Sequence, residues 1–441
     1  MAKLSQIAFS LKRRIKSRKA SVGIIGLGYV GLPLACEFAR AGFKVIGFDT
    51  DAKRVQAISK GVSFIEDIPT KVLKPLVKDG YLSATTSSSS LGACDAIVVC
   101  VPTPLNKIQD PDISYIVSAT QEIKNHLRAG QLVILESTTY PGTTEEIVLA
   151  ELERSGLGVG REFFLCFSPE RIDPGNPKFR AGNIPKVVGG VTPACTELGV
   201  LFYRSILKKV ISVSSPRAAE MTKLLENTFR IVNIGLINEL AGVAQALGVD
   251  IWEVIDAAST KPFGFMPFYP GPGVGGHCIG IDPIYLSWKA RHHGKNVQFI
   301  ELARSINTHM PEYVVDRIVY LLNEKHKKGI YGAKILILGV AYKANVSDVR
   351  ESPALEIMEK LHDLGATTAY HDPYVPEVKI KSSTWRSQTL TRTILKKYDL
   401  VLILTNHASV NYKLVVEAAK LIFDTRNALK SISKRDRIVR L

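Results

Sequence analysis

The stretch that decides the fold is SVGIIGLGYVGLPLACEFARAGFKVIGFDTD, residues 21–51. It opens with the short apolar run VGIIG, which is typical of a buried strand. Residues 31–41 have helical composition and precede Gly42, a frequent helix stop. KVIGFD then predicts a second strand that ends at Asp49. A strand, a turn, a helix and a strand within about 30 residues form the βαβ unit of a parallel sheet.

The turn between this strand and helix carries the pattern G-x-G-x-x-G. Such glycines permit a tight turn and a close approach of a pyrophosphate to the backbone. The free N–H groups and positive dipole end of the helix attract an anion. Asp49 suits a ribose diol and favours NAD over NADP, whereas the nearby Arg54 weakens that preference. We therefore expect NAD binding, with a purely structural turn as the alternative. The motif residues are Gly26, Leu27, Gly28, Tyr29, Val30 and Gly31.

Further apolar runs continue the alternation of strands and helices. They are DAIVVCVP (95–102), QLVILES (131–137) and FFLCFSP (163–169). This alternation indicates a doubly wound α/β domain. The carboxyl ends of such strands line the cofactor crevice, so Thr103 and Thr138 are candidates for cofactor contact. Capping of the following helix is the alternative for both threonines.

A long helix is predicted between Pro216 and Gly248. Ser215 suits the cap and Pro216 the first turn. The intervening ~32 residues span about 48 Å at 1.5 Å per residue, which suits a helix that links domains or subunits. Lys223 and Asn227 lie four residues apart and share one face. Together they can stabilise an oxyanion, although an ordinary solvated face is the alternative.

The strand and helix pattern begins again at residue 334 and includes a strand that ends at Asp372. It indicates a second α/β domain that lacks the glycine pattern. The expected fold is α/β, with two Rossmann-like doubly wound parallel-sheet domains joined by a long central helix. The expected divisions are a basic N-terminal arm (1–20), an NAD-binding domain (21–212), a central helical domain (213–325) and a second Rossmann-like domain (326–441).

Charge limits the classes of partner. The formal net charge is +16, and residues 1–20 carry seven Lys or Arg and no acid. This surplus favours nucleic acid, anionic membrane or phosphorylated small molecules. We expect the arm to be a solvated, partly disordered lead-in. No apolar run approaches the roughly 18 residues of a membrane span, and no secretory signal is apparent, so we expect a cytoplasmic protein.

A nucleic-acid-binding protein that senses NAD is the rival from another functional class. The basic charge motivates it. No predicted helix carries a dense Lys/Arg stripe with interleaved aromatics, and the arm supplies much of the surplus. We therefore expect no nucleic-acid partner.

The six cysteines include no CxxC pair and no cluster with histidines, which argues against zinc and a disulfide framework. Cys278 stands apart because it follows a glycine-rich stretch in PGPGVGGHCIGID, residues 270–282. A thiol beside NAD suggests oxidation of an alcohol to an aldehyde, a thiohemiacetal and a thioester, which water then hydrolyses. Asp282 can orient that water or a lysine. A small apolar residue in a turn is the alternative for Cys278.

Several segments resemble, in matching order, the UDP-glucose/GDP-mannose dehydrogenase family of UDP-sugar 6-dehydrogenases. They cover nearly the whole chain from residue 21 and are GLGYVGLP, ESTTYPGT, FSPERIDPGNP, KLLEN, PGPGVGGHCIGIDPIYL and AYKANVSDVRESP. KPFGFMPFYPGPG and ESTTYPGTTEE are similar to the UDP-N-acetylglucosamine branch. The resemblance implies NAD-dependent, four-electron oxidation of C6, from UDP-N-acetylglucosamine to UDP-N-acetylglucosaminuronate, a precursor of surface glycans. UDP-N-acetylmannosamine and UDP-glucose are the alternatives.

The resemblance also implies residue roles. The catalytic set comprises the nucleophile Cys278, its neighbour Asp282, the oxyanion pair Lys223 and Asn227, the acid–base residue Glu170, and Thr138, which orders water. The substrate set adds Arg171, Tyr269, Gly271, Gly273, Gly275, Lys343 and Arg426 to Glu170, Lys223 and Asn227. Arg350 would contact the cofactor, and Arg426 would reach substrate in the neighbouring subunit. The resemblance thus implies a homodimer joined by the long helix, with UDP bound by the last domain.

This chain departs from the UDP-glucose branch at two places. That branch has a second glutamate four residues after the first, where this chain has Pro174. Either Asp173 substitutes in hydrolysis, or Glu170 acts with Thr138 and Asp282. The neighbouring Arg171 is expected to read the sugar. Upstream of the cysteine, the UDP-glucose branch has a substrate-contacting arginine, where this chain has Lys261–Met266. This segment either makes room for an N-acetyl group or simply packs as a loop.

Overall fold

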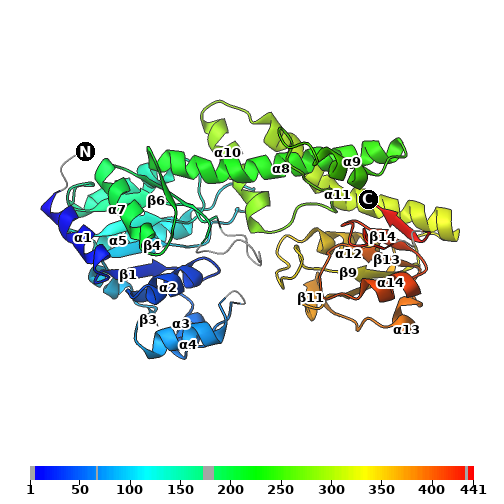
Figure 1. Ribbon diagram of the computed structural model, residues 1–441, viewed down its shortest axis with the longest axis horizontal. Helices are drawn as coiled ribbons and strands as arrows, with labels where there is room; N and C mark the ends of the chain where they lie inside the picture. Colours follow the sequence, from blue (N-terminus) through cyan, green and yellow to red (C-terminus); the bar gives the residue numbers. More distant parts are fainter. Residues whose placement is uncertain (1–4, 66–67, 172–182, 433–435) are drawn as a thin grey trace. The chain divides into compact units, whose positions relative to one another are not determined.

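The computed structural model describes residues 5–65, 68–171, 183–432 and 436–441. The chain divides into two compact units. The first comprises Met1–Glu226 and Ile284–Lys295, and the second comprises Asn227–Pro283 and Asn296–Leu441. Each unit is built around its own sheet (Figure 1).

An eight-stranded sheet forms the first unit, in the order β3-β2-β1-β4-β5-β6-β7-β8. Its described pairs are parallel except β6 with β7. The expected α/β class is confirmed, and the one antiparallel pair refines it. The strands are β1 (Ser21–Ile25), β2 (Lys44–Phe48), β3 (Leu82–Thr85), β4 (Ala96–Val99), β5 (Leu132–Leu135), β6 (Phe164–Phe167), β7 (Lys186–Gly190) and β8 (Val210–Val213).

Helices bury both faces of this sheet, which explains why its strands are apolar throughout. Leu132 and Ile134 of β5 belong to one buried cluster, whereas the alternating Val133 and Leu135 belong to another. The first cluster includes residues of α2 and α7, and the second includes residues of α5. The helical elements are α1 (Gln6–Lys16), α2 (Gly31–Arg40), α3 (Ala52–Ser59), α4 (Thr70–Lys78), η1 (Ser88–Ala93), α5 (Ser114–His126), η2 (Thr144–Leu149), α6 (Ala150–Leu152), η3 (Glu153–Ser155) and α7 (Pro193–Arg204).

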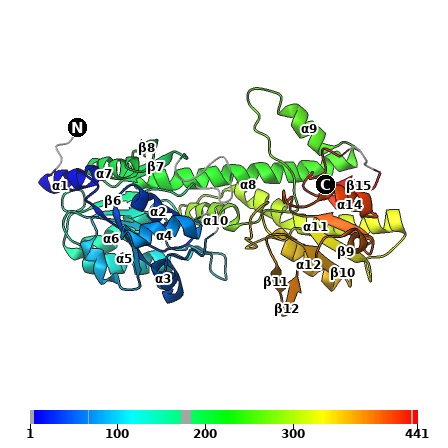
Figure 2. The same cartoon turned by 60° about the horizontal axis from the view of Figure 1, so that its bottom comes forward.

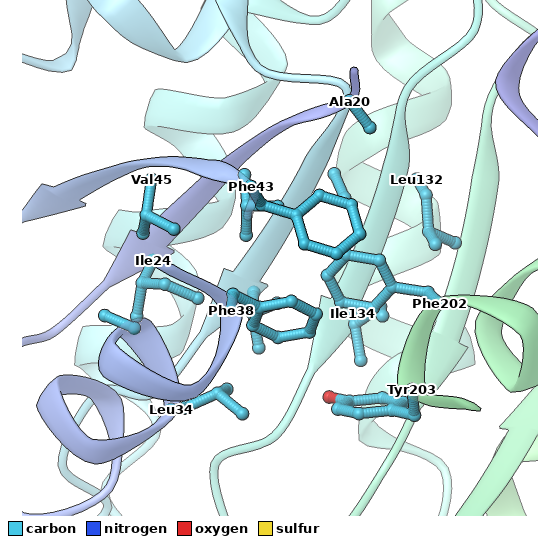
Figure 3. Close-up of a cluster of buried hydrophobic side chains, with 14 of the residues drawn as sticks. Ala20, Ile24, Leu34, Phe38, Phe43, Val45, Leu132, Ile134, Phe202 and Tyr203 are labelled. Carbon is cyan, nitrogen blue, oxygen red and sulfur yellow. The ribbon is translucent and has the colours of Figure 1, made fainter. Parts of the chain in front are cut away.

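Aromatic rings from α2 and α7 pack against each other over the sheet (Figure 3). Phe38 stacks on Phe202 with ring centroids 4.3 Å apart, and Phe43 meets Phe38 edge-on at 5.6 Å. All three rings are fully buried. Each such burial is worth about 1.5–3 kcal/mol. The packing fixes the helix that follows the glycine turn.

The expected disorder of the N-terminal arm is wrong for its described residues. Ser5 caps α1, accepting a hydrogen bond from the N–H of Ala8 at 3.1 Å. Leu11 and Ile15 are buried in the first core, and the helix packs on α7. Arg14 pairs with the buried Asp95 at 2.6 Å. An apolar stripe at helical spacing outweighs the basic charge that suggested a solvated arm.

A parallel five-stranded sheet forms the second unit, in the order β10-β9-β13-β14-β15. Ile335 and Ile337 of β9 pack with α11 and α12, whereas Leu336 and Leu338 pack toward α14. A separate antiparallel hairpin, β11 with β12, extends from it (Figure 2). The elements are β9 (Lys334–Leu338), α12 (Pro353–Asp363), β10 (Thr367–His371), β11 (Glu377–Ile380), β12 (Ser383–Arg386), α13 (Arg392–Leu395), β13 (Leu400–Ile403), α14 (Tyr412–Ala418), β14 (Ile422–Asp424) and β15 (Ile438–Arg440).

The predicted long helix is present as α8 (Pro216–Ala246), with Gly248 in the left-handed conformation (φ +70°) just beyond it. Gly235 allows close packing, because an added Cβ would lie 3.1 Å from Cα of Ala303. Ala303 lies on α11 (Gln298–His326); the remaining helices are α9 (Ile251–Ala258) and α10 (His277–His292). Within the described ranges, none of these helices has the length and apolarity that crossing a membrane would take.

Candidate active site

The three glycines of the first turn are required for different physical reasons. Gly26 has φ +89°, and an added Cβ would lie 2.5 Å from the carbonyl oxygen of Cys100. A Cβ on Gly31 would lie 1.8 Å from the carbonyl oxygen of Gly26. Apart from Gly28 and its two chain neighbours, the described residues place no atom within 4 Å of a Cβ added at Gly28. The fold therefore requires two of the glycines, while Gly28 leaves open backbone that a pyrophosphate can approach.

Asp49 closes this turn from the end of β2. Its Oδ2 accepts the N–H of Leu27 at 2.9 Å, and its Oδ1 accepts the N–H of Asp51 at 2.9 Å. Arg54 lies 3.5 Å from Oδ2. The carboxylate thus stands beside the glycine turn, as a ribose-binding residue must. Arg54 therefore also lies beside the glycine turn. Tyr29, which belongs to the turn, is about half exposed to solvent.

Thr103 and Thr138 follow β4 and β5, so both lie at the carboxyl edge of the sheet. Thr103 is buried, and its carbonyl oxygen accepts the hydroxyl of Tyr285 at 3.0 Å. Thr138 is partly buried. The structure therefore places both threonines at the edge predicted from the sequence.

A buried charged cluster occupies the same edge. Nζ of Lys186 contacts a carboxylate oxygen of Glu136 and lies 2.9 Å from Oε2 of Glu170. Tyr203 donates its hydroxyl to Glu136 at 3.0 Å. Burial lowers the pKa of Lys186 to about 7, and raises the pKa of Cys100 to about 12. Of this cluster, only Glu170 was expected from sequence.

Sequence reasoning missed Lys186 and Glu136 because single charges beside apolar runs look like strand ends. One signal was available. Lys186 opens the run KVVGG, and Glu136 ends VILE. A charged residue that directly adjoins a fully apolar strand is buried with it, unless the chain turns outward at that residue. A buried charge in turn needs a partner.

Arg171 is held by its own unit. Its Nη2 and Nε lie 2.6 and 3.2 Å from the carboxylate oxygens of Glu226, and Nη1 donates to the carbonyl of Pro185 at 2.6 Å. Its backbone N–H donates to Glu170 at 2.6 Å. Its role in reading a sugar stays a prediction. Asp173 and Pro174 lie outside the described residues.

Lys223 and Asn227, which were expected to stabilise an oxyanion, lie on α8. Lys223 and Asn227 are both buried and one turn apart, with Lys223 in the first unit and Asn227 in the second. The amide of Asn227 donates to Asp282, which is also buried. Two expected site residues, Asn227 and Asp282, are thus in direct contact. Cys278 lies in the first turn of α10, four residues before Asp282; its side chain is outside what the structure describes.

The glycines before Cys278 are packed against the same unit. A Cβ on Gly275 would lie 2.7 Å from the carbonyl oxygen of Glu351. A Cβ on Gly276 would lie 2.7 Å from the ring of Tyr342. Gly273 has φ +129°, which disfavours any side chain. Close packing of the chain against itself is therefore a sufficient reason for glycine at these positions. The expected approach of a ligand would be a second reason.

Arg426 meets the start of this loop. A Cβ on Gly271 would lie 2.5 Å from its Nη1, and its Nε donates to the carbonyl of Leu404 at 2.9 Å. Burial lowers the pKa of Arg426 to about 10, and Asp424 opposes the shift. The guanidinium thus lies beside its own chain's loop, and its reach into a neighbouring subunit stays a prediction. Tyr269 is half exposed.

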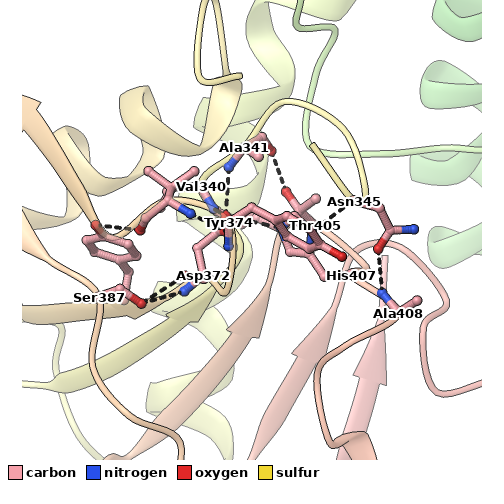
Figure 4. Close-up of polar contacts among 12 residues, drawn as sticks. Val340, Ala341, Asn345, Asp372, Tyr374, Ser387, Thr405, His407 and Ala408 are labelled. Atoms are coloured by element: carbon pink, nitrogen blue, oxygen red, sulfur yellow. Dashed lines mark hydrogen bonds and ion pairs between the residues drawn. The ribbon is translucent and has the colours of Figure 1, made fainter. Parts of the chain in front are cut away.

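The loop that carries Lys343 is tied to β10 by a buried network (Figure 4). Asp372 accepts the N–H groups of Val340 and Ala341 at 2.9 and 3.0 Å. His407 links Asp372 to the N–H of Asn345. Lys343 is partly buried within this loop. Arg350, farther along the segment, is half exposed and forms a fork with the carboxylate of Asp348.

Models of the UDP-glucose/GDP-mannose dehydrogenase family match most of the chain. The NAD binding domain matches residues 20–207, the central domain 217–309, and the UDP binding domain 336–431. The glycine turn and Asp49 fit the NAD that the first model specifies. NAD is therefore the cofactor of this chain, and a UDP-sugar is its substrate class.

Individual relatives carry two substrate names. A Pseudomonas aeruginosa UDP-N-acetyl-D-glucosamine 6-dehydrogenase is 40% identical over 80% of this chain and 83% of its own. A Methanococcus maripaludis UDP-N-acetyl-D-mannosamine dehydrogenase is 35% identical over 92% of each chain. The solved UDP-D-ManNAc dehydrogenase of Pyrococcus horikoshii superposes with a TM-score of 0.86, at 33% identity, over 95% of this chain and 98% of that one. The chain belongs to the UDP-glucose/GDP-mannose dehydrogenase family.

Proposed function

We propose that this enzyme oxidises C6 of UDP-N-acetylglucosamine to the carboxylate, in two oxidation steps and one hydrolysis. The observation that carries the proposal is the match of NAD-binding, central and UDP-binding models in one chain. The sugar is supported by the P. aeruginosa relative and by the apolar, exposed segment at 261–266, which suits an N-acetyl group. UDP-N-acetylmannosamine is the second candidate, because other relatives bear that name.

The proposed chemistry assigns one task to each group. When bound, NAD accepts a hydride in each oxidation. The thiol of Cys278 adds to the aldehyde formed first, and the thiohemiacetal is oxidised to a thioester. Lys223 and the amide of Asn227, which Asp282 orients, stabilise the oxyanion. Glu170 takes a proton from water that attacks the thioester, and the thiolate leaves.

The glycine-rich loop and the second unit would hold the UDP-sugar. We propose that Tyr269, Gly271, Gly273 and Gly275 lie against it and that Lys343 pairs with a phosphate. Arg426 would add a second cation at the start of the loop. We also propose a cytoplasmic location, because that compartment supplies both NAD and UDP-sugars.

A homodimer through α8 is supported by an apolar stripe on that helix. Phe229, Leu236, Leu240 and Val243 of α8, with Leu247 just beyond its end, recur at helical spacing and are 40–73% exposed. A half-exposed apolar stripe of this spacing fits a second copy of the helix. Leu240→Asp should convert the dimer to monomer in light scattering, whereas an unchanged mass would exclude this stripe as the interface.

The deciding experiment measures NADH at 340 nm with limiting UDP-sugar and excess NAD. Two NADH per UDP-N-acetylglucosamine would establish the substrate and the passage to the acid. The panel includes UDP-N-acetylmannosamine and UDP-glucose as comparators. Two NADH with the mannosamine isomer alone would replace the proposed sugar, and one NADH per sugar would place the end of the reaction before hydrolysis.

A further inference from the structure

The carboxyl edge of the first sheet brings charged residues from separate strands together. Glu136 follows β5, Glu170 lies just beyond β6, and Lys186 is the first residue of β7. Because β7 runs antiparallel to β6, its first residue lies at the edge where β5 and β6 end. The topology therefore sets one ammonium between two carboxylates that are distant in sequence.

The most deeply buried part of this cluster holds the side chain of Lys186 in place. Glu136 has no exposed side-chain surface, and Lys186 contacts one of its oxygens. Tyr203 donates to the other oxygen at 3.0 Å, and its ring centre lies 5.2 Å from Nζ of Lys186. Tyr203 is packed in the core beneath (Figure 3). Glu136 and Tyr203 therefore fix the position of the lysine.

The outer end is a carboxylate that solvent can reach. Glu170 is 16% exposed, against 7% for Lys186. Its Oε2 is 2.9 Å from Nζ of Lys186, and its Oε1 accepts the N–H of Arg171 at 2.6 Å. An ammonium between two carboxylates favours their charged forms, whereas without it one of them would retain a proton. Lys186 thus both orients Glu170 and keeps it available to accept a proton.

A small cavity adjoins these groups. Its volume is about 20 Å³, and Glu170, Arg171 and Lys186 are part of its lining. A water molecule needs roughly 10–15 Å³ of cavity volume, together with polar partners. The cavity offers both conditions next to the carboxylate.

We propose that Lys186 is the positioning residue of the hydrolytic step, holding Glu170 as the carboxylate that takes a proton from the attacking water. This inference rests on the proposed function. In the step, the water oxygen forms a bond to the thioester carbon and the C–S bond breaks. One water proton passes to Glu170, and the sulfur leaves as thiolate.

The test compares Lys186→Met with Lys186→Arg by stopped-flow NADH formation. Lys186→Met should keep the rapid burst of two NADH per site within about threefold, while steady-state turnover falls about 100-fold. The thioester should then accumulate and appear in intact-protein mass spectra. KM for the sugar should stay within about threefold. Lys186→Arg should restore turnover to within about tenfold and extend activity to higher pH, since arginine stays charged.

A double variant, Glu136→Gln with Lys186→Met, guards against a folding defect, because it removes the fully buried charge of Glu136 together with the charge of Lys186. It should show the same burst and the same slow hydrolysis. Turnover within twofold of wild type in Lys186→Met, or an equal loss in burst and turnover in both variants, would overturn the inference. A wild-type enzyme that reduces no NAD with any UDP-sugar would instead remove the proposed function itself.

Discussion

Nε2 of His407 lies 3.0 Å from Oδ2 of Asp372, and neither side chain is exposed to solvent. The other ring nitrogen accepts the N–H of Asn345 at 2.9 Å, so the ring proton must reside on Nε2. Asn345 is held with φ +62°, a conformation that few residues adopt without support. One neutral imidazole therefore ties the Lys343 loop to the end of β10.

His407→Phe should loosen that loop and weaken binding of the UDP-sugar. Asp372 would lose a buried hydrogen bond, at a cost of about 1–3 kcal/mol in unfolding free energy. KM for the sugar nucleotide should rise at least fivefold, with KM for NAD unchanged. His371→Phe is the matched control, because the imidazole of His371 contacts the carbonyl oxygen of Gln388 at the surface. Equal effects of both variants would contradict the tether.

Gly28→Ala and Gly31→Ala should separate cofactor binding from folding. The open space around Gly28 predicts an unchanged melting temperature and a KM for NAD raised about tenfold or more. The added methyl of Gly31→Ala would instead clash with backbone, at a cost of about 1–3 kcal/mol in unfolding free energy. Thermal melts and NAD titrations of the two variants check this. A normal KM in Gly28→Ala would mean that pyrophosphate does not approach there.

Cysteine labelling should single out Cys278. Burial raises the pKa of Cys36 to about 12 and of Cys94 to about 11, and it raises that of Cys166 well above its usual value. Buried thiols of this kind react slowly at neutral pH. Iodoacetamide at pH 7.5 should therefore modify one thiol rapidly, and bound UDP-sugar should protect it. Cys278→Ser should abolish both the rapid labelling and the second NADH.

Arg171→Ala should raise KM for the preferred UDP-sugar. Since the guanidinium also pairs with Glu226, the loss of that ion pair needs its own control. Glu226→Gln removes the pair and keeps the arginine, so its KM should stay near that of wild type. Matching increases in both variants would show that the ion pair, rather than sugar contact, is responsible. An unchanged KM in Arg171→Ala would remove this residue from the site.

Stability should rise with pH above neutrality because of Lys186. Burial lowers its pKa to about 7, against about 10.4 in an unfolded chain. Between these values the unfolded state binds one proton more, so the unfolding free energy increases with pH. Cys100, Glu136, Glu170, Tyr203 and Lys223 surround this group. Urea unfolding at pH 7, 8 and 9 should show the rise in wild type.

The reference for that pH series is the double variant with Glu136→Gln and Lys186→Met, which carries neither charge. Its stability should be flatter across the same range. Burial places the titrations of Cys100 and Tyr203 above this window. If unfolding free energy changed with pH in the same way in both proteins, titrating groups other than Lys186 and Glu136 would be responsible for the pH dependence.

Local sequence rules predicted the first sheet well because its determinants are local. The apolar run before Gly26, the helix after Gly31 and the strand ending at Asp49 each follow from composition within a few residues. The long helix from Pro216 followed from its cap and its stop.

What sequence could not supply depends on pairing between distant strands. The direction of β7 decides where Lys186 lies, and nothing near residue 186 encodes an antiparallel neighbour. The contact of Arg426 with Gly271 likewise joins positions 155 residues apart along the printed sequence. Cys278 and Asp282 could be proposed from spacing and resemblance, whereas the partner of Asp282, Asn227, required the fold.

The loop before Cys278 also limits how such an enzyme can change its preferred sugar. At Gly271, Gly275 and Gly276 the space for a side chain is already taken by Arg426, Glu351 and Tyr342. Substitution there would disturb folding before it reshaped a pocket. Under the proposed function, a change of preferred sugar would have to come from neighbouring positions that tolerate new side chains, such as the exposed segment 261–266.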